Sequence, residues 1–244
     1  MKITKATAKG HRTYQEDRYV VFPTVLGTYL GVFDGHGGDE CAVVCTEQLP
    51  TVLSSKPDLR DALAELNENT QRLHSGSTAS LVFIPADNQE TLQGKTMLHV
   101  AVLGDSPVIA KLADGSLWVS PEHNIRTNDA ESDAAIARGG FVNGGYLFAS
   151  YSGQGLQMSR ALGDMELDRV LLRTPEVFSH VLGKDSWVLV CTDGAVDPGH
   201  GAPKTNIAAI VRMIEEEDAD AQDIVDRALA IPTRDNVTAI LVRL

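Results

Sequence analysis

Aspartate residues stand at the ends of apolar, strand-like segments of this sequence, and this pattern most constrains its fold. Four segments carry one each: Asp34 after 29–33, Asp105 after 97–103, Asp193 after 187–191 and Asp235 before 237–242. A carboxylate that is buried without a partner costs free energy. In antiparallel sheets the ends of some strands meet the starts of their neighbours, so we expect the four carboxylates to converge at one edge.

Convergent carboxylates repel each other unless cations lie among them. Hard divalent ions such as Mg²⁺ and Mn²⁺ prefer shells of carboxylate, carbonyl and water oxygens. Glycine follows two of the aspartates, in Asp34-Gly35 and Asp193-Gly194, and glycine allows a sharp turn or a close approach of the backbone to an ion. The sequence therefore predicts a divalent-metal site at this edge.

Short segments rich in β-branched residues predict strands at 29–33, 78–84, 97–103, 187–191 and 237–242. Asp114-Gly115 predicts a hairpin turn between 108–112 and 117–119. Helices are expected at 39–53, 58–73, 130–138, 206–214 and 221–230, the second with Pro57 at its start and leucines at a helical period.

No linker or internal repeat divides the chain, so we expect a single domain over residues 1–244. The order of strands and helices favours an α+β fold of antiparallel sheets with helices packed outside them. The glycine-rich segment 143–155, with aromatic residues that include Tyr146 and Tyr151, is expected to be an irregular loop, either a surface excursion or a functional lid.

Composition narrows the function classes. The formal net charge is −12, from 33 acidic and 21 basic residues, which disfavours binding to nucleic acids and to anionic membranes. The three cysteines indicate a reducing compartment, and Cys41 and Cys45, four apart in a predicted helix, are interpreted as core residues. No apolar stretch is long enough to span a membrane and no apolar segment opens the chain, so we expect a soluble, cytoplasmic protein.

Two further side chains are expected to take part in chemistry at this edge. His36 lies in the turn Asp34-Gly35-His36-Gly37-Gly38, where we expect its ring to be exposed beside a carboxylate and able to exchange protons. Arg12 precedes the pair Glu16-Asp17, and its planar guanidinium suits a phosphate bound at the metals. The other six histidines, including His123, have no comparable surroundings.

The sequence resembles the metal-dependent protein serine/threonine phosphatases of the PP2C (PPM) type over nearly its whole length. Val32-Phe33-Asp34-Gly35-His36-Gly37-Gly38 is similar to the family's most specific motif, and Arg12 to Asp17 to its first, with Gln15 where asparagine is usual. The remaining motifs follow in the family's order: 76–79, Gly104-Asp105-Ser106, Gly139-Gly140, Ser159-Arg160-Ala161-Leu162-Gly163-Asp164, Thr192-Asp193-Gly194 and Asp235-Asn236-Val237-Thr238.

The resemblance implies a four-layer fold, α-β-β-α, with a central antiparallel β-sandwich and two Mg²⁺ or Mn²⁺ ions at one end. It implies that Asp34 bridges both ions, that the Gly35 carbonyl helps to hold one, and that Asp193 and Asp235 hold the other. It further implies that Glu16 acts through water, that Asp17 supports the ligands, and that Asp105, Asp193 and Asp197 form a third, weaker position.

The reaction implied is hydrolysis of phosphoserine and phosphothreonine in protein substrates, by direct attack of a hydroxide that bridges the metals. Arg12 would hold the phosphate, and His36 would protonate the leaving oxygen as general acid. No covalent phosphoenzyme is needed, and the cysteines lack the anion-binding loop of a thiolate phosphatase. We expect a monomer.

The sequence departs from the family's usual residues at several positions. Pro107 stands where arginine is common, Val196 where tryptophan is frequent, and Ala134-Ala135 where Arg-Ile is usual. None of these removes an expected metal ligand. The segment 143–155 falls where the family carries a variable flap beside the active site.

Two other functions remain as alternatives. A catalytically inactive relative that serves as a binding scaffold would be expected to have lost metal-binding aspartates, and all are present here. A two-metal hydrolase of nucleotides or small phosphomonoesters is the second, although no glycine-rich phosphate loop before a helix is found.

Overall fold

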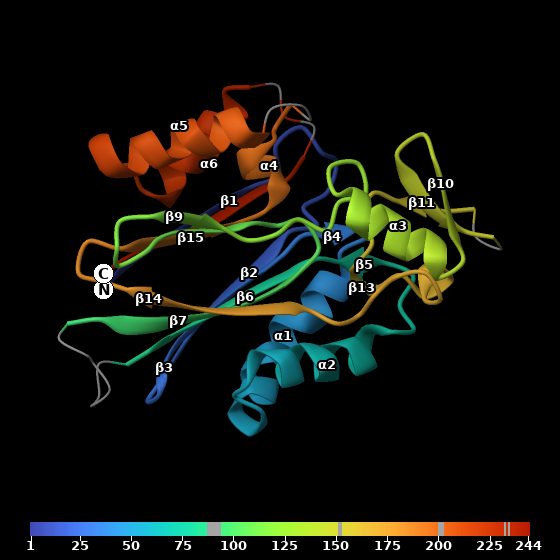
Figure 1. The fold of residues 1–244 in the computed structure, drawn as a ribbon, viewed down its shortest axis with the longest axis horizontal. Coiled ribbons are helices and arrows are strands. Elements are labelled where there is room, and N and C mark those ends of the chain that lie inside the picture. Colours follow the sequence, from blue (N-terminus) through green and yellow to red (C-terminus); the bar gives the residue numbers. More distant parts are fainter. Residues whose placement is uncertain (87–93, 151–152, 200–202, 232, 234) are drawn as a thin grey trace.

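The computed structural model describes residues 1–86, 94–150, 153–199, 203–231, 233 and 235–244. Two five-stranded antiparallel sheets lie face to face, with helices on both outer sides (Figure 1). The first sheet has the order β1 (Lys2–Ala8), β16 (Val237–Arg243), β15 (Trp187–Cys191), β8 (Val108–Lys111) and β9 (Leu117–Val119). The second has the order β14 (Glu176–Leu182), β7 (Thr96–Leu103), β6 (Ala79–Pro85), β3 (Gly27–Phe33) and β2 (Arg18–Thr24).

The central strands are apolar throughout because both of their faces are buried. In β3, Leu30 and Val32 point to the opposite sheet, while Tyr29 and Phe33 join the core beneath the helices α1 (Glu40–Ser55) and α2 (Leu59–Thr70). The side chains of β15 alternate in the same way between the inter-sheet core and a third core. This third core lies under α5 (Pro203–Glu216) and α6 (Ala221–Leu229).

The four layers are therefore α1 and α2, the two sheets, and α5 and α6 (Figure 1). The expected α+β, α-β-β-α fold is confirmed. The predicted strands and helices are present with ends shifted by a few residues, and the Asp114-Gly115 turn joins β8 to β9. Cys41 and Cys45 belong to the buried face of α1 and pack in the core, as interpreted from the sequence.

A smaller unit lies beside the sandwich, and here one expectation was wrong. The described residues of segment 143–155 are not an irregular loop: they contribute to a three-stranded sheet of β10 (Gly140–Asn143), β11 (Tyr146–Ala149) and β12 (Gly155–Leu156). This sheet packs with α3 (Asp129–Ala137) around a separate apolar cluster that includes Leu147 and Leu156. The expected aromatic residue Tyr151 lies outside the described residues.

Short elements complete the chain. The strands β4 (Gly35–His36), β5 (Gly76–Ser77) and β13 (Leu162–Gly163) form a second small sheet. The one-turn helix α4 (Asp193–Val196) follows β15, and the 3₁₀ turn η1 (Met165–Leu167) follows β13. Within the described ranges, no helix is both long and apolar enough to cross a membrane.

The contact between α1 and α2 provides a test of the packing. Leu63 is fully buried in the α1–α2 core, so we expect Leu63→Ala to lower the free energy of unfolding by about 2–5 kcal/mol in urea denaturation. Glu68→Ala, on the exposed face of the same helix, should change it by less than about 0.5 kcal/mol. Equal effects of the two substitutions would contradict this account of the helix.

Candidate metal centre

The strand-end aspartates surround one cavity of about 640 Å³. Asp34, Asp105, Asp193 and Asp235 all line it, and so do Gly35, Arg12 and His36. The structure thus brings together the four carboxylates that the sequence pattern placed at one edge. Of the other expected ligands, Asp197 lines an adjoining cavity, while Glu16 and Asp17 are not among the lining residues of either cavity.

Backbone hydrogen bonds fix the turn after β3. The Asp34 amide donates to Thr78 Oγ1 at 3.1 Å, and the Thr78 amide donates to the Asp34 carbonyl at 2.9 Å. Gly35 then passes so close to the chain before β2 that a Cβ atom would lie 2.5 Å from the Glu16 carbonyl oxygen. Gly194 is equally constrained, since a Cβ there would lie 2.0 Å from the Asn236 carbonyl oxygen. The two glycines allow the β3, β15 and β16 ends to converge.

Asp17 is buried directly behind the other aspartates. Its Oδ2 accepts hydrogen bonds from Thr192 Oγ1 at 3.0 Å and Thr238 Oγ1 at 2.7 Å. Burial, opposed by these hydrogen bonds, raises the pKa of Asp17 to about 7. Asp17 therefore joins the ends of β15 and β16 from below the cavity.

The carboxylates destabilise one another's charges. Burial first, and then the charges of Asp17 and Asp193, raise the pKa of Asp34 well above its usual range. Burial and the charges of Asp105 and Asp235 raise the pKa of Asp193 in the same way. Among the described residues, the buried atoms Asp17 Oδ1 and Asp193 Oδ1 have no hydrogen-bond partner. Unpartnered oxygens and crowded carboxylates are what a bound divalent cation would stabilise, so the residues present fit such a group.

Glu16 and Arg12 lie at the mouth of the same edge. The Gly38 amide donates to Glu16 Oε1 at 2.7 Å, and the Glu16 amide donates to Asn236 Oδ1 at 2.8 Å. The Arg12 guanidinium lies 2.9 Å from Asp235 Oδ1 and 3.7 Å from Glu16 Oε2. Arg12 is thus positioned between two expected metal-binding carboxylates.

The ring of His36 differs from expectation because it is largely covered, with 24% of its side chain exposed. Its Nε2 lies 2.8 Å from Asp164 Oδ2. Burial lowers the pKa of His36, but the charge and hydrogen bond of Asp164 outweigh that effect, and the net pKa is raised. Gly76 makes this pair sterically possible, since a Cβ there would lie 2.1 Å from Asp164 Oδ2 and 2.3 Å from His36 Nε2.

Asp164 is a site residue that the sequence analysis missed, although it ends one of the motifs quoted there. Its backbone adopts the left-handed conformation with φ of 51°, and the chain turns there from β13 into η1. The preceding Gly163 also has positive φ, at 72°, and passes against the Ser75 carbonyl. Consecutive left-handed residues aim the Asp164 carboxylate back toward His36.

Asp105 connects the main cavity to the adjoining one. Its Oδ2 accepts a hydrogen bond from Asn124 Nδ2 at 2.8 Å, and burial raises its pKa to about 6. Asp105, Asp193 and Asp197, the three residues of the expected third metal position, all line the adjoining cavity of about 300 Å³.

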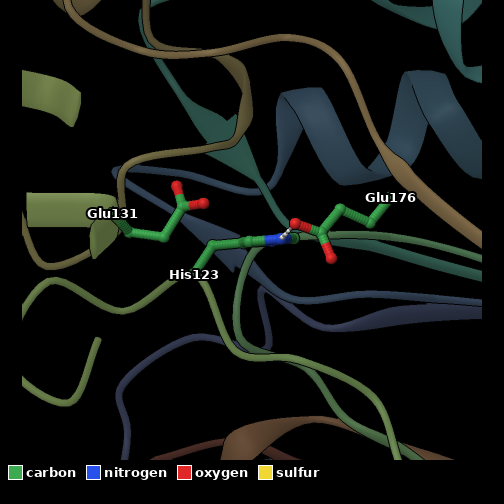
Figure 2. A group of neighbouring side chains, drawn as sticks. All are labelled: His123, Glu131 and Glu176. Atoms are coloured by element: carbon green, nitrogen blue, oxygen red, sulfur yellow. Dashed lines mark ion pairs between the residues drawn. The ribbon is translucent and has the colours of Figure 1, made fainter. Parts of the chain in front are cut away.

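A second group of potential ligands lies under α3 (Figure 2). Ligand atoms of His123, Glu131 and Glu176 lie within 4.8 Å of one another. The Arg160 guanidinium, however, pairs with both glutamates, so each carboxylate already has a cationic partner. His123 is fully buried, its Nδ1 accepts the Gly104 amide at 3.0 Å, and burial followed by the charge of Arg160 lowers its pKa. We interpret this group as a buried ion-pair network that holds the backbone before Asp105, a role that the sequence analysis did not assign to His123.

Comparisons with known proteins agree with this geometry. Residues 24–237 match the family model described as Protein phosphatase 2C. A probable protein phosphatase 2C of Arabidopsis thaliana (number 76) is 28% identical over 245 residues, which cover 96% of this chain and 57% of that relative. The chain thus spans just over half the length of that curated relative.

Solved structures show the same fold. A sex-determining protein of C. elegans superposes with a TM-score of 0.78 at 25% identity, covering 98% of this chain and 64% of the other. A phosphatase from Toxoplasma gondii superposes with a TM-score of 0.79 at 18% identity, covering 99% and 92%.

The raised carboxyl pKa values predict a pH-dependent response to metals. Because the folded-state pKa of Asp17 is about 7 against 3.8 for the ordinary group, its contribution to the stability of the metal-free protein should fall as pH rises through that window. Divalent ions compete with protons for such carboxyls, so their stabilisation should grow with pH. At 100 times Kd, Mn²⁺ should raise Tm by roughly 5–10 °C at pH 7.5 and by much less at pH 5 in a thermal melt.

The matched pair of variants for this melt is Asp34→Asn in the cavity and Asp133→Asn on the exposed side of α3. The first should lose most of the metal-induced rise in Tm, and the second should keep it. A rise in Tm that does not depend on pH, or that survives in Asp34→Asn, would contradict the assignment of the centre.

Proposed function

Because this chain belongs to the protein phosphatase 2C family, we propose that it is a metal-dependent protein serine/threonine phosphatase. The observation that carries the proposal is the convergence of four strand-end aspartates around one cavity that also contains Arg12 and the His36–Asp164 pair. We further propose that residues 1–244 form one phosphatase domain that acts as a monomer in the cytoplasm. The three free cysteines support the reducing compartment.

The residues that would hold two Mg²⁺ or Mn²⁺ ions are Asp34, the Gly35 carbonyl, Asp193 and Asp235. Glu16 would contribute through water and Asp17 from behind, while Asp105, Asp193 and Asp197 would form the third position. Ions bound there would supply a hydroxide nucleophile near neutral pH and offset the charge of the phosphate. The remaining chemistry belongs to side chains of the chain itself.

Arg12 would bind the substrate phosphate. Its guanidinium contacts Asp235 and Glu16 and lines the cavity, so a small movement would present its planar donors to phosphate oxygens. The exposed fraction of its side chain, 43%, leaves room for this movement.

His36 would donate a proton to the departing seryl or threonyl oxygen. Asp164 fixes one ring nitrogen, Nε2, and favours the protonated ring, as the raised pKa of His36 indicates. Nδ1 has no hydrogen-bond partner among the described residues, so it is the nitrogen left to donate the second proton. We therefore propose that Asp164 positions the His36 ring and favours its protonated form, so that His36 can act as general acid.

The alternatives gain no support from these observations. A scaffold without activity would not need the crowded aspartates that destabilise one another, and every one of them is retained.

The direct test is phosphate release from a phosphothreonine peptide by metal-stripped protein titrated with Mn²⁺ and Mg²⁺. We expect turnover that depends on the metal and that Asp193→Asn abolishes while its far-ultraviolet circular dichroism stays unchanged. Asp185→Asn, an exposed position before β15, is the matched control and should remain active. If the folded wild-type protein is inactive with both metals and calorimetry detects no ion binding, the proposal is wrong.

Two substrates with different leaving groups distinguish a role of His36 and Asp164 in proton transfer from a general loss of structure. An alkyl leaving group needs protonation and an aryl one needs less, so His36→Ala should lower kcat on a phosphothreonine peptide by about 100-fold or more and on 4-nitrophenyl phosphate far less. Asp164→Asn should show the same selective loss to a smaller degree. Losses of equal size on the two substrates would argue against this role for either residue.

A further inference from the structure

A second cavity of about 300 Å³ opens beside the metal centre, between the β8–β9 edge of the sandwich and the helices α4 and α5. It is continuous with the main cavity, because Asp105, Arg126, Gln157 and Asp193 line both. A substrate whose phosphate lies among the aspartates would therefore have its neighbouring residues close to this second cavity.

The wall away from the aspartates is apolar. Pro107 precedes β8, Val119 ends β9, Pro121 follows that strand, Val196 ends α4, and Ile207 lies in α5. These five side chains form the apolar wall of the cavity.

Most polar side chains that line the cavity already form hydrogen bonds with neighbouring groups of the protein. Ser120 Oγ accepts the Val108 amide at 3.0 Å, and Thr127 Oγ1 donates to Glu122 at 2.6 Å. Asn124 uses its amide on Asp105 and its carbonyl on the Arg126 backbone. A polar occupant would have to compete for these bonds, whereas an apolar one gains buried contact with the wall.

Arg126 is the cationic side chain of the second cavity. Its side chain packs along Gly145 in the β10–β11 turn, where a Cβ would lie 3.2 Å from Arg126 Cδ, and it lies on the boundary of the two cavities. No carboxylate of the described residues forms an ion pair with it. A basic occupant would meet this charge together with the carboxylates of the same lining, Asp105, Glu122, Asp193 and Asp197, so the preference for an apolar occupant rests on the apolar wall.

We propose that this cavity is a substrate subsite that binds an apolar side chain close in sequence to the phosphorylated serine or threonine. The proposal rests on the phosphatase function proposed above and adds a specificity to it. Leucine is the probe side chain of choice, because it is apolar and small enough for a cavity of this size.

The test uses phosphothreonine peptides in which one leucine replaces alanine at each of the three positions on either side of the phosphorylated residue. We expect one position at which leucine raises kcat/KM by about tenfold over alanine. In Val119→Trp, which fills the cavity, this preference should disappear. Leu117→Trp, on the same face of β9 but outside the cavity, should retain it.

The preference is a ratio of two substrates on one protein, so a partly unfolded variant does not distort it. Pro107→Arg gives a second filling variant on a different element, and it should lower the ratio as well. Hydrolysis of all peptides without any leucine preference, or a preference that survives in Val119→Trp, would overturn the subsite alone. No metal-dependent hydrolysis of any peptide would overturn the proposed function and the subsite together.

Discussion

The repulsion among buried carboxylates at one edge of the sandwich is the constraint on which the rest of the site depends. Asp17, Asp34 and Asp193 each have a raised pKa because burial and neighbouring negative charges oppose ionisation. Such a group persists only where the surrounding fold contributes enough stability to offset it. Here the offset comes from three apolar cores, two of them against the helices and one between the sheets. The fold thus supplies the stability, and bound cations would relieve the repulsion.

The sequence predicted the parts of the fold in which one physical signal dominates. The central strands are apolar on both faces, and α2 shows a helical period of leucines with Pro57 near its start, so both were recognised. The edge strands β2 and β14 were not, because each is covered on one side only and contains polar or partly exposed residues, with Pro23 in β2. The single turn of α4 is too short to produce a period.

The candidate site was predictable to a similar extent. The aspartates at strand ends can be recognised in the sequence. Their convergence could then be predicted, because antiparallel topology brings the ends of neighbouring strands together. Asp164 is not visible in this way: its contact with His36 joins residues 128 positions apart and depends on the left-handed backbone at Asp164 itself. The buried network of His123, Glu131, Arg160 and Glu176 likewise joins a loop, α3 and β14, and no local spacing indicates it. The segment 143–155 was misjudged because its glycines indicated a loop, while its short apolar run Tyr146–Ala149 forms β11 and Gly155 begins β12.

The proposed metal centre and the proposed subsite both include residues of one helical turn, α4. Asp193 opens α4 and faces the main cavity, whereas Val196 closes the same turn and lines the second cavity. A substitution at Val196 therefore disturbs the backbone that holds an expected metal ligand. Val119 and Ile207 lie on β9 and α5, which carry none of the expected ligands. Substitutions at Val119 and Ile207 should therefore change the proposed preference for apolar side chains without moving the aspartates, because they alter only the wall of the second cavity.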